Sequence, residues 1–398
     1  MNEFKKDLKD ASELKQLGKL SEALKLFEKQ YEIHPNEFTY NQKVDYAWSI
    51  IKFRMTNPKD DEEFLNAATD IIKMLPQADL NVKRSCPYTS AVFKVLIRYR
   101  NDGDYISMIP WIERLNPELL DEKPYRSHGR LQKPRREKYY DWASKAYLDN
   151  MEFEKCIEVC QTALNELKSF QDDGDTWLRW RMAKSMKELN QLKEALEFFK
   201  KVIEVKHDWY MYREIAEIYY RCGRPYDALD YLCPAVLSRE SAKTKVNLYL
   251  LCYKVFKVFN PEMALKHAQL YYLIKSENNY SIPYEIEKLD IDETQINKKQ
   301  LERQIRDLWT RYKFKNRKLH HGTVINFIDE RNFGFIRDEN DEEIFFHKSQ
   351  FKGDTVYVGQ IVSFYTEESF DKSKNRKSIN AINVRCEQSC TVRNAEMK

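Results

Sequence analysis

The amino-acid sequence predicts a multidomain chain, with an all-α helical-repeat solenoid over residues 1–275 and a small all-β barrel of five strands over residues 319–385. Three observations predict this fold class. The chain has 398 residues, which is more than one hydrophobic core usually serves. Apolar residues recur at helical spacing from residue 3 to about 275. After Lys318 the pattern changes to the alternation that is typical of strands.

The composition predicts helix over most of the chain and argues against a membrane-spanning or a disulfide-bonded protein. Charged residues make up 33% of the chain and only nine residues are glycine, which favours helices. No stretch of 18 apolar residues occurs, so we expect no membrane contact. The eight cysteines are scattered and most lie within amphipathic patterns, which is typical of buried thiols in a reducing, cytoplasmic protein.

Several segments share one layout, in which a helix and a short turn lead into a second helix with a small residue on its buried face. The small residues are Cys156, Ala195, Ala228 and Ala264, which are spaced by 39, 33 and 36 positions. This layout resembles the tetratricopeptide repeat, whose period is about 34 residues. The resemblance is good at 5–34 and 136–275 and loose between 37 and 120. It implies stacked helix pairs whose concave groove binds a protein partner.

A basic segment interrupts the repeats at residues 123–138. Pro124, Gly129 and Pro134 predict a loop there. The segment has a net charge of +6, because Glu137 is its one acid and it holds seven bases: Lys123, Arg126, Arg130, Lys133, Arg135, Arg136 and Lys138. Two interpretations remain open, a phosphate contact and a solvated, mobile loop.

Residues 276–318 join the two folds and hold the densest positive charge of the chain. A linker is predicted first, and a helix from about 293 to 312 follows it. Residues 297–318 carry a net charge of +7, from nine bases against Glu302 and Asp307. An apolar stripe on this helix should dock on the last repeat or on the barrel, and its members are Leu301, Ile305, Leu308, Trp309 and Tyr312.

Five short segments of alternating pattern follow Lys318. They lie at 322–327, 333–336, 343–347, 361–364 and 379–384, with polar turn residues between them. Five strands in so short a region predict a Greek-key barrel of the oligonucleotide-binding kind, and residues 386–398 form a tail.

Five motifs of this region resemble the cold-shock domain and occur in that family's order. Asn332–Ile336 is similar to the first ribonucleoprotein motif of the family, and Ile344–His347 is similar to the second. The other matches are Gly322–Val324, Gly359–Phe364 and Ala381–Val384. The resemblance implies binding of single-stranded RNA or DNA and does not decide between them.

Strand alternation predicts the same site independently. Phe333 and Phe335 should share one face of their strand, and Phe345 and His347 should share that face on the neighbouring strand. The opposite, inward face is already occupied by Ile336, Ile344 and Phe346. We therefore predict an exposed aromatic platform on which unstacked bases stack.

The barrel departs from the family pattern in three places. Asn326 stands where the family has Trp, Lys348 where an aromatic residue is frequent, and Asn332 where the family has Gly. Residues 319–385 also hold nine bases and eleven acids, a net charge of −2. We therefore expect the basic helix to supply the positive field, and the predicted site combines Phe327, Arg331, Phe333, Phe335, Phe345, His347 and Lys348 with Lys313, Lys315, Arg317 and Lys318.

The sequence contains no phosphate-binding glycine loop, no HExxH and no nucleophile elbow. We therefore expect a protein that is not an enzyme and uses no cofactor. A closed barrel could bring together four residues from its two ends, Cys386, Cys390, His320 and His321. Their spacing is not that of a standard zinc knuckle, and no metal site is predicted.

Together these features predict a non-enzymatic adaptor. Its repeats would bind a protein partner, and its barrel would bind single-stranded RNA or DNA without strong sequence preference. The alternative is an assembly or scaffold subunit whose barrel docks on protein and has lost nucleic-acid binding, which the missing Trp and the acidic barrel would explain. A third interpretation, the regulatory subunit of a nuclease or similar effector, is compatible with either.

Overall fold

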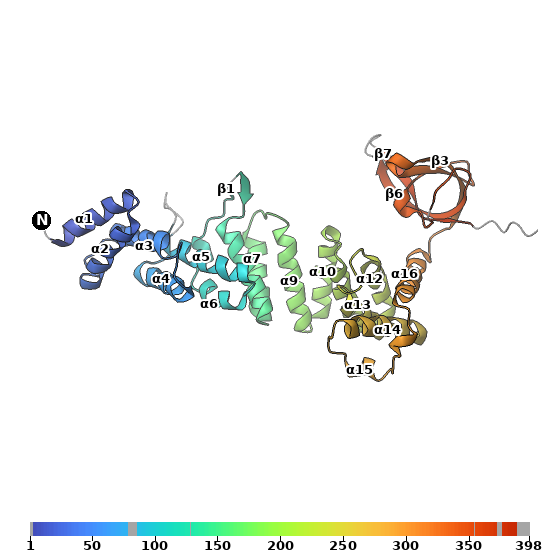
Figure 1. The fold of residues 1–398 in the computed structure, drawn as a ribbon, viewed down its shortest axis with the longest axis horizontal. Coiled ribbons are helices and arrows are strands. Elements are labelled where there is room, and N and C mark those ends of the chain that lie inside the picture. The colour runs from blue at the N-terminus through green and yellow to red at the C-terminus, as the bar shows by residue number, and fades with distance from the viewer. Residues whose placement is uncertain (1–2, 79–85, 128, 354, 372–375, 388–398) are drawn as a thin grey trace, which may run out of the picture. The chain divides into compact units, whose positions relative to one another are not determined.

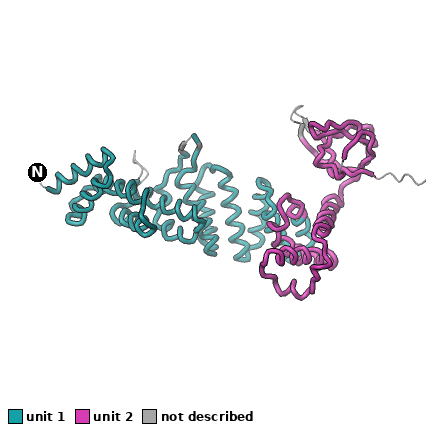
Figure 2. Tube along the Cα trace, in the orientation of Figure 1, with its two compact units in different colours: residues 1–232 teal, residues 233–398 magenta. Residues whose placement is uncertain are grey.

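The computed structural model describes residues 3–78, 86–127, 129–353, 355–371 and 376–387. The chain forms two compact units, residues 1–232 and residues 233–398, and each is described by itself (Figures 1 and 2). None of the described helices is both long enough and apolar enough to cross a membrane.

Unit 1 is built of helices that pack in consecutive antiparallel pairs. Three-residue turns join α1 to α2, α7 to α8, α9 to α10 and α11 to α12, and the last of these helices ends in unit 2. The helices are α1 (Glu3–Gln16), α2 (Leu20–Ile33), α3 (Tyr40–Phe53), α4 (Asp61–Met74), α5 (Pro87–Asp102), α6 (Ile109–Ile112), α7 (Arg135–Asp149), α8 (Phe153–Glu166), α9 (Gly174–Glu188), α10 (Leu192–Val205), α11 (Trp209–Arg221) and α12 (Pro225–Leu237).

The four three-residue turns share a backbone conformation. Their central residues all have a left-handed backbone, with φ of 77° at Gly18, 61° at Met151, 60° at Asn190 and 70° at Gly223. Glycine and asparagine tolerate this conformation, whereas methionine does so at a cost. The repeated turn shows that these helix pairs are copies of one structural unit.

The small residues of the predicted repeat lie at the helix–helix contacts. Cys156, Ala195 and Ala228 are fully buried on the second helix of their pairs, and Ala264 of unit 2 is buried as well. A small side chain at this position lets the two helices of a pair approach closely. The predicted array of tetratricopeptide-like helix pairs is therefore confirmed.

The basic segment 123–138 is more ordered than the loop that its prolines and glycine predict. Its middle forms a two-stranded hairpin of β1 (Tyr125–Ser127) and β2 (Arg130–Gln132), and α7 already begins at Arg135. Arg136 is mostly buried and forms ion pairs with Glu122 and Glu166. The side chains of Arg126 and Arg130 lie outside the described residues.

Unit 2 begins with helices that continue the repeat pattern. α13 (Val246–Phe256) packs against α14 (Pro261–Glu277), and the short α15 (Tyr284–Glu287) and the basic α16 (Lys298–Phe314) follow. The apolar stripe of α16 docks on α14, where the indole N–H of Trp309 donates to Nε2 of His267 at 2.9 Å. Both side chains are fully buried. Of the two docking surfaces that the sequence left open, the last repeat and the barrel, the structure thus shows the last repeat.

The barrel closes in the order β3-β4-β5-β7-β6 (Figure 1). All neighbouring strands are antiparallel except β5 and β7, which pair in parallel. Its core consists of Val324, Ile336, Ile344, Phe346, Phe351, Val362, Phe364, Ala381 and Val384. The strands are β3 (His320–Ile328), β4 (Phe333–Asp338), β5 (Glu343–His347), β6 (Ile361–Asp371) and β7 (Arg376–Cys386), so the predicted five-stranded closed barrel is confirmed.

Candidate nucleic-acid interface

Three phenylalanine rings gather on the outer face of β4 and β5. Phe333 pairs with His347 and Phe335 pairs with Phe345 in the antiparallel register, so all four side chains lie on one face. The ring centroids of Phe333 and Phe345 are 5.4 Å apart, and those of Phe335 and Phe345 are 5.9 Å apart. The three phenylalanines are half-buried and His347 is exposed. We call Phe333, Phe335, Phe345 and His347 the ring face.

The core side of the same two strands explains why the rings stay outside. Ile336 and Phe346 are fully buried and Ile344 is nearly so, which leaves no room for further large rings inside. Gly334 lies between the two phenylalanines of β4 and points inward. A Cβ there would come within 2.3 Å of the carbonyl oxygen of Asn326 and 2.8 Å of the Phe346 ring, so glycine is required.

Asn332 is a departure from the family pattern that the backbone explains. It follows the 3-10 turn Asp329–Arg331 and has φ of 55°, in the left-handed region. Asparagine is the residue that most readily replaces glycine in that conformation. The substitution therefore preserves the turn that leads into β4.

His347 has a defined tautomer because its neighbours fix one ring nitrogen. The backbone N–H of Ser349 donates to Nδ1 of His347 at 3.2 Å, so the neutral ring carries its proton on Nε2. An exposed ring with an N–H donor can stack on a base and also donate to it.

Three other predicted residues lie at the edge of the barrel core or beside it. Phe327 is half-buried and stacks on the core residue Phe346, with centroids 6.1 Å apart. The ammonium of Lys348 lies 5.7 Å from the Phe327 ring and 3.0 Å from Asp329. Arg331 is exposed in the turn before β4.

The basic end of α16 is fixed to the barrel by an aromatic contact that the sequence did not reveal. The rings of Phe314 and Tyr365 are stacked, with centroids 4.3 Å apart and an interplanar angle of 7°. Arg317 donates to the carbonyl oxygen of Thr366 at 3.2 Å, and Lys315 lies 3.9 Å from the Tyr312 ring. Lys313 and Lys318 are exposed. The four predicted cations therefore lie next to the barrel, although not on the ring face itself.

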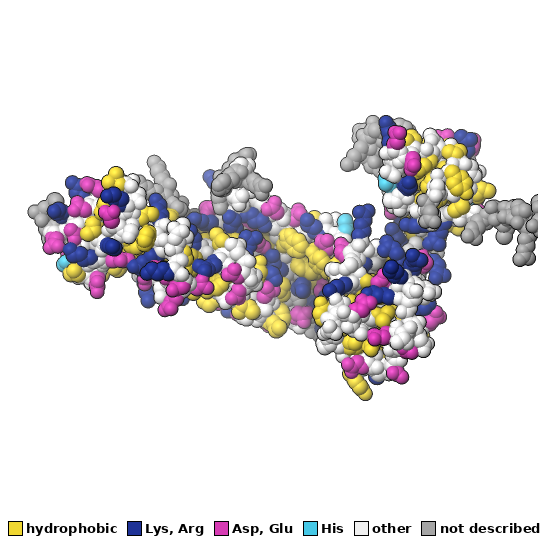
Figure 3. Space-filling model, viewed as in Figure 1, with side chains coloured by type: hydrophobic (Ala, Val, Ile, Leu, Met, Phe, Trp, Pro, Cys, Tyr) yellow, Lys and Arg dark blue, Asp and Glu magenta, His cyan; other side chains and the backbone are white. Residues whose placement is uncertain are grey.

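A basic cleft of about 850 Å³ lies within unit 2, between α16 and the β7 side of the barrel. Figure 3 shows Lys and Arg side chains gathered around α16. Asp307 is the one carboxylate among the described residues that line the cleft. Its five cations are Arg239, Arg306, Lys313, Lys352 and Arg385. Of these, only Lys313 belongs to the predicted site.

The cations of this basic cleft repel one another. Partial burial, together with the charges of Arg306, Arg385 and Lys313, lowers the pKa of Lys352. No described acid forms an ion pair with any of the five cations. Such a cluster destabilises the free protein slightly and is relieved when an anion binds.

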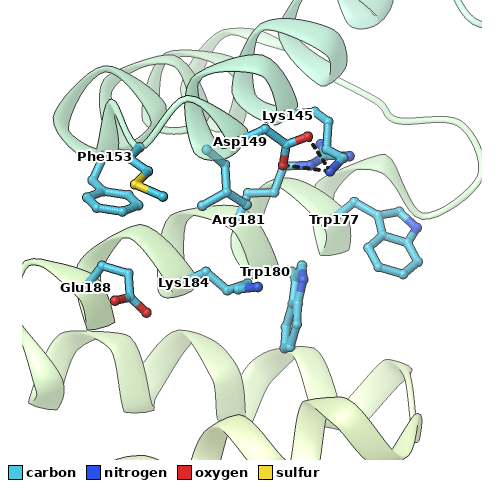
Figure 4. A pocket seen from close by; sticks show the side chains of 10 residues that line it. Lys145, Asp149, Phe153, Trp177, Trp180, Arg181, Lys184 and Glu188 are labelled. Carbon is cyan, nitrogen blue, oxygen red and sulfur yellow. Dashed lines mark hydrogen bonds and ion pairs between the residues drawn. The ribbon is translucent and has the colours of Figure 1, made fainter. Parts of the chain in front are cut away.

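Unit 1 holds a second candidate site, a groove of about 550 Å³ between α7, α8 and α9 (Figure 4). Trp177 and Trp180 line it, as does Met151 from the turn after α7. Its cations are largely neutralised inside the protein, since Lys145 donates to Asp149 at 2.8 Å and Arg181 donates to Asp141 at 2.8 Å. The groove therefore offers rings and apolar surface more than net charge.

Metal ligands do not come together in the described part of the chain, where no group of three or more His, Cys, Asp or Glu residues could hold a metal ion. Nδ1 of His321 instead lies 2.5 Å from Glu387. Cys390, the fourth residue of the cysteine and histidine group at the ends of the barrel, lies outside the described residues.

Comparison with known proteins assigns the barrel. Residues 320–386, from the first residue of β3 to the last of β7, match the family model described as the 'Cold-shock' DNA-binding domain. The predicted cold-shock-type domain is therefore confirmed. No curated protein matches the chain with significance.

The chain is also similar to solved structures at low identity. One is a putative kinesin light chain from Podosopora anserina with nearly identical TPR-like repeats, at 14% identity over 48% of this chain and 97% of that chain, with a TM-score of 0.35. Another is MamA, at 10% identity over 46% and 96%, with a TM-score of 0.35. A third is BtubC from P. vanneervenii, at 11% identity over 62% and 95%, with a TM-score of 0.36.

Proposed function

We propose that this protein is a non-enzymatic adaptor that binds single-stranded RNA or DNA through its barrel and a protein partner through its helix pairs. The ring face carries the first half of the proposal. Three rings within 6.0 Å of one another lie on the outside of a closed barrel whose core is complete without them. Stacking of a base on such a ring contributes about 1–3 kcal/mol and tolerates most sequences.

The charges support binding by a combined unit rather than by the barrel alone. The barrel segment has a net charge of −2, whereas residues 297–318 have +7. The Phe314–Tyr365 stack and the Arg317–Thr366 hydrogen bond hold this basic segment against β6. We propose that Lys313, Lys315, Arg317 and Lys318 attract the phosphates of a strand whose bases contact the ring face.

The groove of unit 1 supports the second half of the proposal. Met151 is 75% exposed and holds a left-handed backbone conformation, where two of the equivalent turns have glycine and one has asparagine. Together with Trp177 and Phe153 it lines the groove shown in Figure 4. Aromatic and methionine side chains are the usual anchors of protein interfaces, so we propose this groove as the contact for a protein segment.

A second candidate function is an assembly subunit whose barrel docks on protein. The acidic barrel and Asn326 in place of the family's Trp favour it, because both weaken the attraction for a nucleic acid. Under that function the ring face would be an apolar docking surface.

Fluorescence anisotropy with labelled single-stranded RNA, single-stranded DNA and duplex DNA tests the proposal. The native chain should bind the single strands, and the Phe333→Ala/Phe345→Ala variant should lose that binding. Tyr284→Ala is a matched control, because this ring is 77% exposed on the helical part of unit 2. If the native chain binds none of the three nucleic acids, the docking function replaces the proposal.

A further inference from the structure

The basic cleft is the strongest feature that the proposed ring face leaves unused. It is open and its volume is about 850 Å³. Its lining combines cations from α16, from the segment after α12, from the segment that follows β5 and from the end of β7. Arg239 and Arg385 are exposed and Lys352 is partly exposed, and the three come from segments far apart in the sequence. A fold that brings such charges together favours a multiply charged anion as the occupant.

Asn383 of β7 is a polar residue in the lining of the same cleft. Ser363 of β6 pairs with Arg385 and Tyr365 pairs with Ile382, so Asn383 and Val384 together face Phe364 in a β-bulge. Asn383 has φ of 49° and is only 5% exposed, and its Oδ1 accepts no hydrogen bond from a described residue. Bulges commonly redirect a side chain beside a functional site. Only the amide N–H groups of Asn383 can donate to a phosphate oxygen, since its Oδ1 is an acceptor.

The basic cleft begins where the ring face ends. His347 closes β5, and the short turn Lys348–Gln350 leads directly to Gln350, which lines the cleft. Three residues span at most about 11 Å, so the two surfaces are within reach of one extended strand. The N–H of Lys352 donates to the carbonyl oxygen of Val384 at 2.8 Å and fixes this segment beside β7.

The lining of the basic cleft favours a nucleic-acid backbone over a protein segment. Protein interfaces rely on buried aromatic and aliphatic anchors. Here the large apolar side chains are Leu237 and Phe314 alone among the lining residues, and the ring of Phe314 is already covered by Tyr365. Phosphates need cations and hydrogen-bond donors, which dominate this lining.

We infer that the basic cleft binds the sugar–phosphate backbone of the single strand whose bases stack on the ring face. This inference rests on the proposed function and extends its site by Arg239, Arg306, Lys352, Asn383 and Arg385. A strand long enough to cross the ring face would continue into the cleft. A strand of three or four nucleotides would occupy the ring face only.

The test compares full-length native protein with Lys352→Gln/Arg385→Gln on labelled oligouridines of 4 and 12 nucleotides, and on oligothymidines of the same lengths. The control variant, Lys254→Gln/Lys266→Gln, removes the same charge from side chains that are paired with Glu285 and Glu262. For single strands each phosphate contact contributes about 0.7 to the salt slope, or about fivefold in affinity at 0.1 M salt relative to 1 M salt. Loss of two contacts should thus weaken binding of the 12-nucleotide strand about 25-fold at 0.1 M salt.

The expected result is this loss for the longer strand alone, with native affinity for 4 nucleotides and no effect in the control. The RNA and DNA arms show which backbone the cleft takes. Native affinity of the cleft variant for 12 nucleotides overturns the inference and leaves an acidic protein segment as the occupant. An equal loss for both lengths, or the same loss in the control, also overturns it. The Phe333→Ala/Phe345→Ala variant separates the proposed function from this inference. If that variant loses binding while Lys352→Gln/Arg385→Gln binds as tightly as the native protein, the proposed function stands and the inference about the cleft fails.

Discussion

The ring face and the basic cleft belong to one unit but are built in opposite ways. The ring face consists of neighbouring residues of two paired strands, and it has rings with little charge around them. The basic cleft consists of residues from distant segments, and it has cations with few rings. Stacking depends little on salt, whereas phosphate contacts depend on it strongly. Mutations of the two surfaces should therefore separate the affinity for a single strand from its salt dependence.

Removal of two rings is expected to have the largest effect on binding. Each ring contributes about 1–3 kcal/mol, so Phe333→Ala/Phe345→Ala should weaken single-strand binding by at least about 30-fold. The slope of affinity against salt concentration should remain that of the native protein, because no cation is lost. Anisotropy titrations at four salt concentrations measure both quantities. A flattened slope with unchanged affinity at high salt would contradict the division between the two surfaces.

Acid is expected to weaken the packing of α16 on α14, which positions one wall of the basic cleft, and to leave the ring face unaffected. Complete burial lowers the pKa of His267 to about 4, and its ring, which carries its proton on Nδ1, accepts the Trp309 hydrogen bond on Nε2. The folded protein binds this proton more weakly than the unfolded chain, whose histidine pKa is near 6.5. Stability is therefore fully present above pH 6.5 and falls by about 3 kcal/mol as the pH drops from 6.5 to 4.

Denaturant unfolding at several pH values measures that loss. His267→Gln serves as the control, because glutamine can still accept from Trp309 but does not titrate in this range. The difference in unfolding free energy between native and variant should change with pH between 6.5 and 4 and stay constant above 6.5. Parallel curves for the two proteins over the whole range would show that His267 is not the group responsible.

Removal of a paired cation is expected to have the smallest effect on binding. Arg136 lies in the basic segment 123–138, whose net charge is +6, yet it forms ion pairs with Glu122 and Glu166 and is mostly buried. Arg136→Gln should therefore leave affinity for a 12-nucleotide strand within about twofold and the salt slope unchanged, since a neutralised charge attracts little. Circular dichroism verifies that the helices remain folded. A clear loss of slope would instead support the phosphate interpretation of residues 123–138.

The ring face and the helix pairs could be predicted from the sequence because each depends on a pattern of residues that are close together in the chain. Phe333, Phe335 and Phe345 could be placed on the ring face because strand side chains alternate and the inward positions were visibly filled. The helix pairs could be located because one small residue recurs at Cys156, Ala195 and Ala228. Both predictions rest on periods of two or of about 34 residues that can be read along the chain.

The basic cleft could not be predicted from the sequence, because it forms where segments that are distant in the chain meet. Nothing near Lys352 or Arg385 shows that they share a cleft with Arg239, because the closure of the barrel and the docking of α16 create that proximity. The Phe314–Tyr365 stack was missed for the same reason. Residues 125–132 were expected as loop because Pro124, Gly129 and Pro134 dominate the pattern, and three paired residues per strand give too short an alternation to detect.

The proposed function requires that a single strand lies on the ring face. Ultraviolet cross-linking of a 4-thiouridine-labelled 12-nucleotide RNA to the full-length protein, with mass-spectrometric mapping of the adducts, tests it most directly. Adducts are expected on the peptides that contain Phe333, Phe335 and Phe345, and they should be lost in the Phe333→Ala/Phe345→Ala variant. Adducts confined to the helices of unit 1, with none on β4 or β5, would contradict it.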